Sequence, residues 1–239
     1  MSKRFLTGVC IGLCLSMGLH AQFSDKDLFI AYLHSDMPAW DRYLHSERWD
    51  TLSLKEQLRY INYEYGYVAT AIDATQPDAK EHLEAFKAHI DALERILPEA
   101  TYKTYLSSYC AYRAKLSTLE FVKQGLKAKN LAMEAAQSDP TNPLALTLVG
   151  CIDFYAPAIV GGNKERALQT FKQTKRLLEL SGDTINNWNY ASVEMQLAMC
   201  LAKTGHKEEA IALCEQLLQK YPGFVFIRDE YYPTLLPRR

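Results

Sequence analysis

The chain lacks the short motifs that mark most enzymes. It contains no HExxH metal-binding pair, no GxSxG nucleophile turn, no phosphate-binding loop and no GxGxxG dinucleotide motif. His82 and His89 lie seven residues apart, and two histidines are too few for a metal site, so we expect exposed surface histidines. The sequence therefore predicts no enzyme, no metal and no cofactor. One alternative stays open, an enzyme whose site is assembled from dispersed residues.

Concentrated positive charge is missing as well. The 239-residue chain has 27 basic and 28 acidic side chains and no run of five or more basic residues. Without Lys3 and Arg4 of the N-terminal segment, 25 basic side chains stand against 28 acidic ones, a net charge of −3. Nucleic acids and anionic membrane surfaces attract proteins through clustered Lys and Arg, so we expect neither as a partner.

Long stretches of alternating apolar and polar residues, the pattern of a β-strand, are absent too. Glycine is scarce, with 11 residues. Apolar residues instead recur every three or four positions, as in Leu54, Leu58, Ile61, Tyr65 and Val68. This spacing puts apolar side chains on one face of a helix. It predicts helices over 54–71 and 79–97, the second ending at Pro98, and an all-α fold.

The N-terminal apolar segment is too short for a membrane span. The run 5–19 has about fifteen residues, whereas a spanning helix needs roughly 20. Lys3 and Arg4 precede this run and Ala21 follows it, which is the layout of a cleavable secretory signal. We expect a signal peptide over 1–21 and a protein exported to the periplasm or outside the cell, with no membrane span after cleavage.

The cysteines of the mature chain form no close pair. Successive spacings are 41, 49 and 14 residues, which match no CxxC or other metal-binding pattern. An exported protein could oxidise them to disulfides, whereas their apolar helical surroundings favour buried free thiols. Both states stay open for Cys110, Cys151, Cys200 and Cys214.

Prolines and short glycine turns divide the mature chain into helices of about 12 to 20 residues, a length range typical of globular helices. Because the turns are short, successive helices should pack as antiparallel pairs. We divide the chain into an N-terminal helical region 22–100, a region of repeated helix pairs 101–224 and a C-terminal tail 225–239. The tail carries several aromatic residues, and we expect it to cover the last helix pair.

The last helix pair carries an ordered pattern of large and small residues. The pattern consists of Leu197, Ala198, Leu201, Gly205, Ala210, Cys214, Leu217 and Pro222. It resembles the tetratricopeptide repeat, in which small residues let two helices approach closely and bulky residues fill the groove between them. Glu194 stands where the family usually has a large aromatic residue, so this unit is divergent.

Weaker copies of the pattern lie upstream. Ala167 and Phe171 match Ala210 and Cys214 across 43 residues, whereas a repeat of this family has about 34. A third copy contains Ala128, Ala132, Ala135 and Pro140. The resemblance is therefore good over 101–224. It implies a right-handed solenoid of antiparallel helix pairs, and this architecture presents a concave face to partners.

The resemblance also places a groove on the first helix of each pair. The positions carried over from the family are Leu144, Thr147, Cys151, Ser192, Met195, Gln196 and Met199. They are uncharged, and the Lys/Asn carboxylate clamp of chaperone-binding relatives is missing. The implied partner is a protein or peptide, or a small apolar ligand. A register error of one residue would return the two methionines to the core.

Tyrosines form a further candidate wall in the front half. Tyr102, Tyr105, Tyr109 and Tyr112 share one stripe of a predicted helix. Tyrosine suits both a helix interface and a binding surface, because its large ring carries a polar tip. Core packing is one interpretation, and a binding wall of Tyr105, Tyr109 and Tyr112 is the other.

One turn suggests an alternative function. Residues 156–163 read APAIVGGN, which is similar to a turn in exported tetratricopeptide proteins that include the T components of TRAP transporters. The resemblance implies a periplasmic accessory component of a transporter. A loop between paired helices explains the same residues, because glycine permits positive φ and Asn163 can cap a helix. We thus expect an exported scaffold, with the transporter role as its alternative.

Overall fold

The computed structural model describes residues 23–237, and within them the fold is all-α, with no β-strand. This confirms the predicted fold class. The α-helices are α1 (Asp25–Leu33), α2 (Met37–Ser46), α3 (Leu54–Asp73), α4 (Ala79–Ala92), α5 (Glu99–Leu116), α6 (Phe121–Ser138), α7 (Pro143–Tyr155), α8 (Lys164–Ser181), α9 (Trp188–Lys203), α10 (Lys207–Lys220) and α11 (Tyr232–Leu235). The expected signal peptide 1–21 lies outside the described residues.

Side-chain caps set most of the helix starts. Ser24 and Ser53 each form a capping box with the acidic residue three positions on, which begins α1 and α3. Asn163 begins α8 by accepting a hydrogen bond from the main-chain N–H of Arg166 at 2.9 Å. α4 stops at Ala92, before the expected end at Leu97, and the chain continues as turns over 93–96 up to Pro98.

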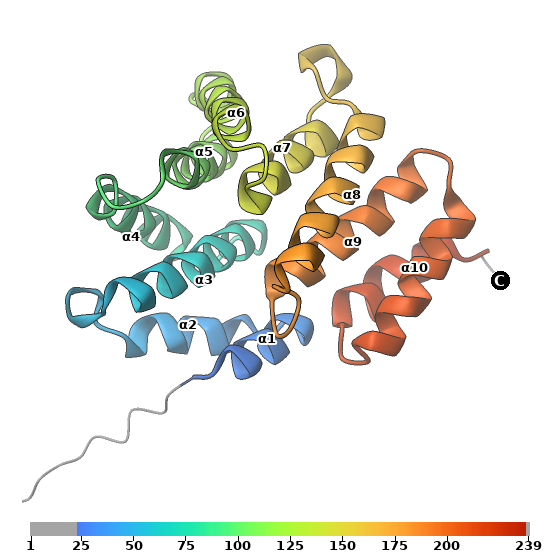
Figure 1. The fold of residues 1–239 in the computed structure, drawn as a ribbon, viewed down its shortest axis with the longest axis horizontal. Coiled ribbons are helices and arrows are strands. Elements are labelled where there is room, and N and C mark those ends of the chain that lie inside the picture. Colours follow the sequence, from blue (N-terminus) through green and yellow to red (C-terminus); the bar gives the residue numbers. More distant parts are fainter. Residues whose placement is uncertain (1–22, 238–239) are drawn as a thin grey trace, which may run out of the picture.

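Neighbouring helices pair as a solenoid requires. α5 packs against α6, α7 against α8 and α9 against α10, and α3 and α7 both contact α5 (Figure 1). Small residues allow this close packing. A Cβ added at Gly150 in α7 would lie 2.9 Å from the buried Phe171 ring of α8, so a larger residue there would force the ring to move. None of the helices in residues 23–237 is both long enough and apolar enough to cross a membrane.

The N-terminal helices return to the C-terminal ones, so the two ends of the array touch. α1 contacts α9 (Figure 1). The Trp188 ring of α9 lies 5.4 Å from Trp40, 5.7 Å from Tyr32 and 5.8 Å from Tyr65, measured between ring centroids. Asn189 donates to Asn62 Oδ1 at 3.0 Å, across 127 residues of sequence. We call the four rings Tyr32, Trp40, Tyr65 and Trp188 the aromatic junction.

The C-terminal segment, residues 224–237, packs against α9 and α1. Phe224, Ile227 and Leu235 are buried, and the Tyr231 hydroxyl donates to the main-chain oxygen of Ala198 in α9 at 3.4 Å. Phe224 lies 5.8 Å from Tyr32 of α1, again between ring centroids. The segment therefore covers the last helix pair and also contacts the first helix of the chain.

An ion pair between a buried carboxylate and an exposed lysine occupies the divergent position of the last unit. Glu194 is 5% exposed, and Lys220 Nζ of α10 lies 2.9 Å from its Oε2. Lys220 also lies over the rings of Tyr190 and Tyr221, at 4.3 and 4.8 Å from their centroids. The pair thus links α9 to α10 where the family has an aromatic side chain.

Candidate functional site on the inner helices

The groove positions implied by the resemblance form a partly exposed, uncharged stripe on α7 and α9. Leu144 and Cys151 of α7 and Ser192, Met195 and Met199 of α9 are half-buried. Thr147 and Gln196 are buried, and Gln196 Nε2 donates to the Tyr155 hydroxyl at 3.1 Å. Tyr155 is 59% exposed and continues the stripe at the end of α7. The binding role of these residues stays a prediction.

The tyrosines of α5 do not share one environment. Tyr105 is buried, with its ring edge-on to Tyr65 at 6.1 Å and to Phe86 at 6.0 Å. Tyr109 is also buried, and Arg113 of the same helix donates to its hydroxyl at 3.3 Å. Tyr112 stacks on Tyr65 and stays half-buried. Core packing accounts for Tyr105 and Tyr109, and Tyr112 remains accessible beside the stripe.

A polar pocket lies where α7 and α9 begin. Its volume is about 440 Å³, within the range of small-ligand sites. It is bounded by α3, the first turns of α7 and α9, and the loop between α8 and α9. Leu144 and Thr147 of the predicted groove line it. So do five asparagines, namely Asn62, Asn142, Asn186, Asn187 and Asn189.

Two of these asparagines are occupied as helix caps. Asn142 Oδ1 accepts from the main-chain N–H groups of Leu144 and Ala145, and Asn187 Oδ1 accepts from those of Asn189 and Tyr190. An asparagine at a turn is typical of a helix cap, so the sequence did not indicate a pocket here. The spacing of Asn186, Asn187 and Asn189 was the available signal.

Two others keep hydrogen-bonding capacity. Asn189 Nδ2 donates to Asn62 Oδ1, and this bond uses only one polar group of each amide. Both side chains are half-buried at the wall of the pocket. Asn62 Nδ2 and Asn189 Oδ1 can therefore supply one donor and one acceptor to a ligand, the pair that a peptide group requires.

Two of the three charged side chains that line the pocket, Asp25 and Arg59, compensate one another, and Asp183 is the third. Arg59 Nε lies 2.7 Å from Asp25 Oδ1, and Arg59 Nη2 donates to the main-chain oxygen of Phe23 at 2.6 Å. The Tyr63 hydroxyl donates to the same Asp25 oxygen at 3.1 Å. This arrangement holds the guanidinium at the start of α1, so the remaining polar lining consists of Asp183, Thr147 and neutral amide groups.

The histidines of α4 are not surface residues, and our expectation of exposed side chains was wrong. The side chains of His82 and His89 are 12% and 17% exposed. His89 Nδ1 lies 2.8 Å from Oε2 of the buried Glu64, and its ring stacks on Trp49 at 4.0 Å. Both side chains are largely covered because they face α2 and α3. The seven-residue spacing alone does not show which neighbours a helix face contacts.

The four cysteines of the described residues are free thiols. Burial raises the pKa of Cys151 and Cys200 to about 12 and that of Cys214 to about 11, and it also raises the pKa of Cys110. Only the thiolate reacts readily with alkylating agents. We expect all four to stay unmodified by iodoacetamide at pH 8 in the native protein, and all to react after denaturation, as read by mass spectrometry. Rapid native alkylation of the half-buried Cys151 would contradict this.

Comparison with known proteins agrees with the geometry of the last helix pair. Residues 193–223 match the tetratricopeptide repeat family model, and they span most of α9, the Gly205 turn and all of α10. No curated protein matches the chain. The matched unit and the packed helix pairs upstream of it agree with the predicted all-α solenoid of tetratricopeptide-like architecture.

Proposed function

We propose that this protein is an exported scaffold that holds an extended segment of another protein on its inner helices. The tetratricopeptide match supports an interaction scaffold in general. The observation that carries the finer proposal is the polar pocket, where Asn62 and Asn189 offer a donor and an acceptor to a peptide group. An extended peptide satisfies such amides with its main chain and needs no charge of its own.

The uncharged stripe supports the same partner. It starts at Leu144 in the pocket and continues along α7 to Tyr155, with Ser192, Met195 and Met199 on α9. Methionine is flexible and polarisable, so it adapts to different apolar side chains of a bound segment. Main-chain recognition in the pocket and apolar contacts along the stripe together suit a polypeptide better than a small apolar molecule.

Photo-crosslinking in the native host tests the proposal. A photoreactive amino acid placed at Ser192 or Asn186 should capture one partner segment, whereas the same group at Asn130, exposed on α6, should not. The captured segment, made as a peptide, should bind the purified protein. Asn189→Ala or Met199→Glu should weaken this binding about tenfold, or ~1.4 kcal/mol, with the circular dichroism unchanged.

Exposed apolar residues around the start of α6 offer an alternative binding site, and binding there would contradict the proposal. Leu119, just before α6, and Phe121 and Val122 at its start are 99%, 60% and 68% exposed, and none of the three lines the pocket. If the partner crosslinks to position 122 and its binding is lost in Val122→Asp but unaffected by Asn189→Ala, the inner helices are not the binding site.

The turn between α7 and α8 gives no separate support to a transporter role. Gly161 adopts a φ of 92°, and Asn163 caps α8. Arg166 pairs with the buried Asp153 and donates to the Gly161 main-chain oxygen at 2.8 Å. These contacts account for the residues of the turn through local structure, so the proposal stays with the scaffold.

A further inference from the structure

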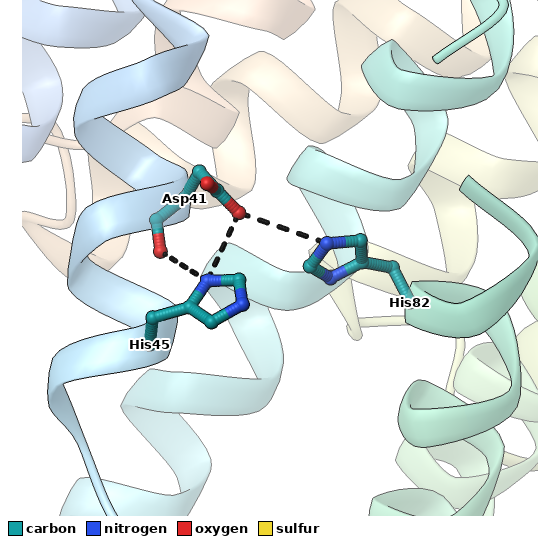
Figure 2. A group of neighbouring side chains, drawn as sticks. All are labelled: Asp41, His45 and His82. Atoms are coloured by element: carbon teal, nitrogen blue, oxygen red, sulfur yellow. Dashed lines mark hydrogen bonds and ion pairs between the residues drawn. The ribbon is translucent and has the colours of Figure 1, made fainter. Parts of the chain in front are cut away.

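Three side chains with metal-binding groups converge between α2 and α4, outside the pocket and the stripe. Asp41 and His45 are one turn apart on α2, and His82 lies in the first turns of α4 (Figure 2). His45 Nδ1 lies 3.1 Å from Asp41 Oδ1, and His82 Nε2 lies 3.6 Å from the same oxygen. The three atoms all lie within 4.8 Å of one another.

These separations suit a tetrahedral metal ion. With metal–ligand bonds of about 2.0–2.1 Å, neighbouring ligand atoms of a tetrahedral zinc site are roughly 3.3 Å apart. The two separations from Asp41 Oδ1 lie on either side of that value. The His45 side chain is 66% exposed, so its ring can turn toward an ion without moving α2.

An orphaned oxygen gives independent support. Asp41 Oδ1 is buried and has no hydrogen-bond partner among residues 23–237, although two imidazoles lie beside it. The hydrogen bond of His45 Nδ1 goes instead to the main-chain oxygen of Asp41 at 3.0 Å. A buried acceptor left without a hydrogen bond destabilises the folded state. A cation bound between the three side chains would satisfy it.

The surroundings also favour a cation. Asp78 Oδ2 lies 3.5 Å from His82 Nε2, so a second carboxylate adjoins the three ligands. The ring of Tyr67 lies edge-on to His82 at 4.7 Å between centroids. One carboxylate and two imidazoles form a donor set suited to zinc and similar divalent transition metals, and the charge of Asp78 adds to the attraction for a cation.

We propose that Asp41, His45 and His82 bind a divalent transition-metal ion of the zinc class, with water as the fourth ligand. The ion would join α2 to α4, two helices that are otherwise connected mainly through α3. Because the three ligands are placed together only in the folded chain, metal binding would stabilise the fold. Nothing in this proposal depends on the peptide-binding function.

A zinc titration of the mature protein without a histidine tag tests this site. Competition with a chromophoric chelator should give one equivalent of Zn²⁺ bound with a dissociation constant in the micromolar range or tighter, and Zn²⁺ should raise the melting temperature. His45→Ala and His82→Ala should each weaken binding by at least about tenfold and abolish the thermal shift. Asp41→Asn keeps the size of the side chain and should also weaken binding.

The matched control is His206→Ala, which removes a histidine paired with Glu209 at 2.9 Å on the surface of α10. It should bind Zn²⁺ as the parent does. The proposal is overturned if the parent shows no saturable Zn²⁺ binding, or if His45→Ala and His82→Ala, folded by circular dichroism, bind as tightly as the parent. If only His206→Ala lost Zn²⁺ binding, the ion would bind at a different site, and the proposal would be overturned as well.

Discussion

His89→Ala should lower the free energy of unfolding by about 3 kcal/mol at pH 7.5, because it leaves a buried carboxylate without its partner. Glu64 is 2% exposed, and both of its carboxylate oxygens lie within 3.0 Å of His89 Nδ1. The substitution also removes a ring stacked on Trp49. Urea-induced unfolding, followed by circular dichroism, measures the loss.

The pH dependence separates the charge effect from the packing effect. Burial raises the pKa of Glu64, and the bond from His89 lowers it in part. A carboxyl whose pKa is higher in the folded than in the unfolded chain adds stability below its unfolded pKa and loses it as pH rises through its folded pKa. In the His89→Ala background, Glu64→Gln should therefore recover stability at pH 7.5 and much less at pH 5. An equal recovery at both values would contradict a buried charge as the cause.

Gly66→Ala should destabilise the protein by about 1–3 kcal/mol, although alanine is normally the better helix former. Gly66 lies inside α3, beneath the aromatic junction. A Cβ at this position would meet Trp40 Cζ3 at 2.7 Å and Trp188 Cη2 at 2.9 Å. Both rings are buried by neighbours from several helices, so neither can move away without opening the contact between α3 and α9.

Gly125→Ala is the matched control for this clash. Gly125 also lies inside a helix, α6, and an added Cβ there has no atom within 4 Å in the described residues. Helix propensity alone then acts, and the substitution should stabilise the protein by about 0.4–1 kcal/mol. Thermal and urea unfolding of the two variants should therefore shift in opposite directions. Shifts of the same sign would show that the junction does not restrict position 66.

The sequence predicted the helical class and the last helix pair well, because both depend on local spacing. Leu197, Ala198, Ala210 and Cys214 carry the packing of α9 on α10, and these positions recur in any repeat of this type. It also predicted buried free cysteines at Cys110, Cys200 and Cys214 as one of two interpretations.

The sequence did not predict the sites formed by residues that lie far apart in the chain. Asp41 and His82 come from helices separated by α3, and no spacing rule brings them together. Asn62 and Asn189 meet across 127 residues. The region 22–100 carries no repeat signature, so nothing in it indicated that α1 would contact α9. Candidate sites built from several helices were therefore outside the reach of periodicity.

The contact between the first and last parts of the array changes how the molecule should come apart. An open array of repeats can fray from either end, because a terminal unit contacts only one neighbour. Here α1, α3 and α9 share the aromatic junction, and Phe224 of the C-terminal segment packs on Tyr32. Within the described residues the first and last helices therefore hold each other. The fold should be lost as one cooperative unit, and no helix pair could be deleted without exposing the faces of the remainder.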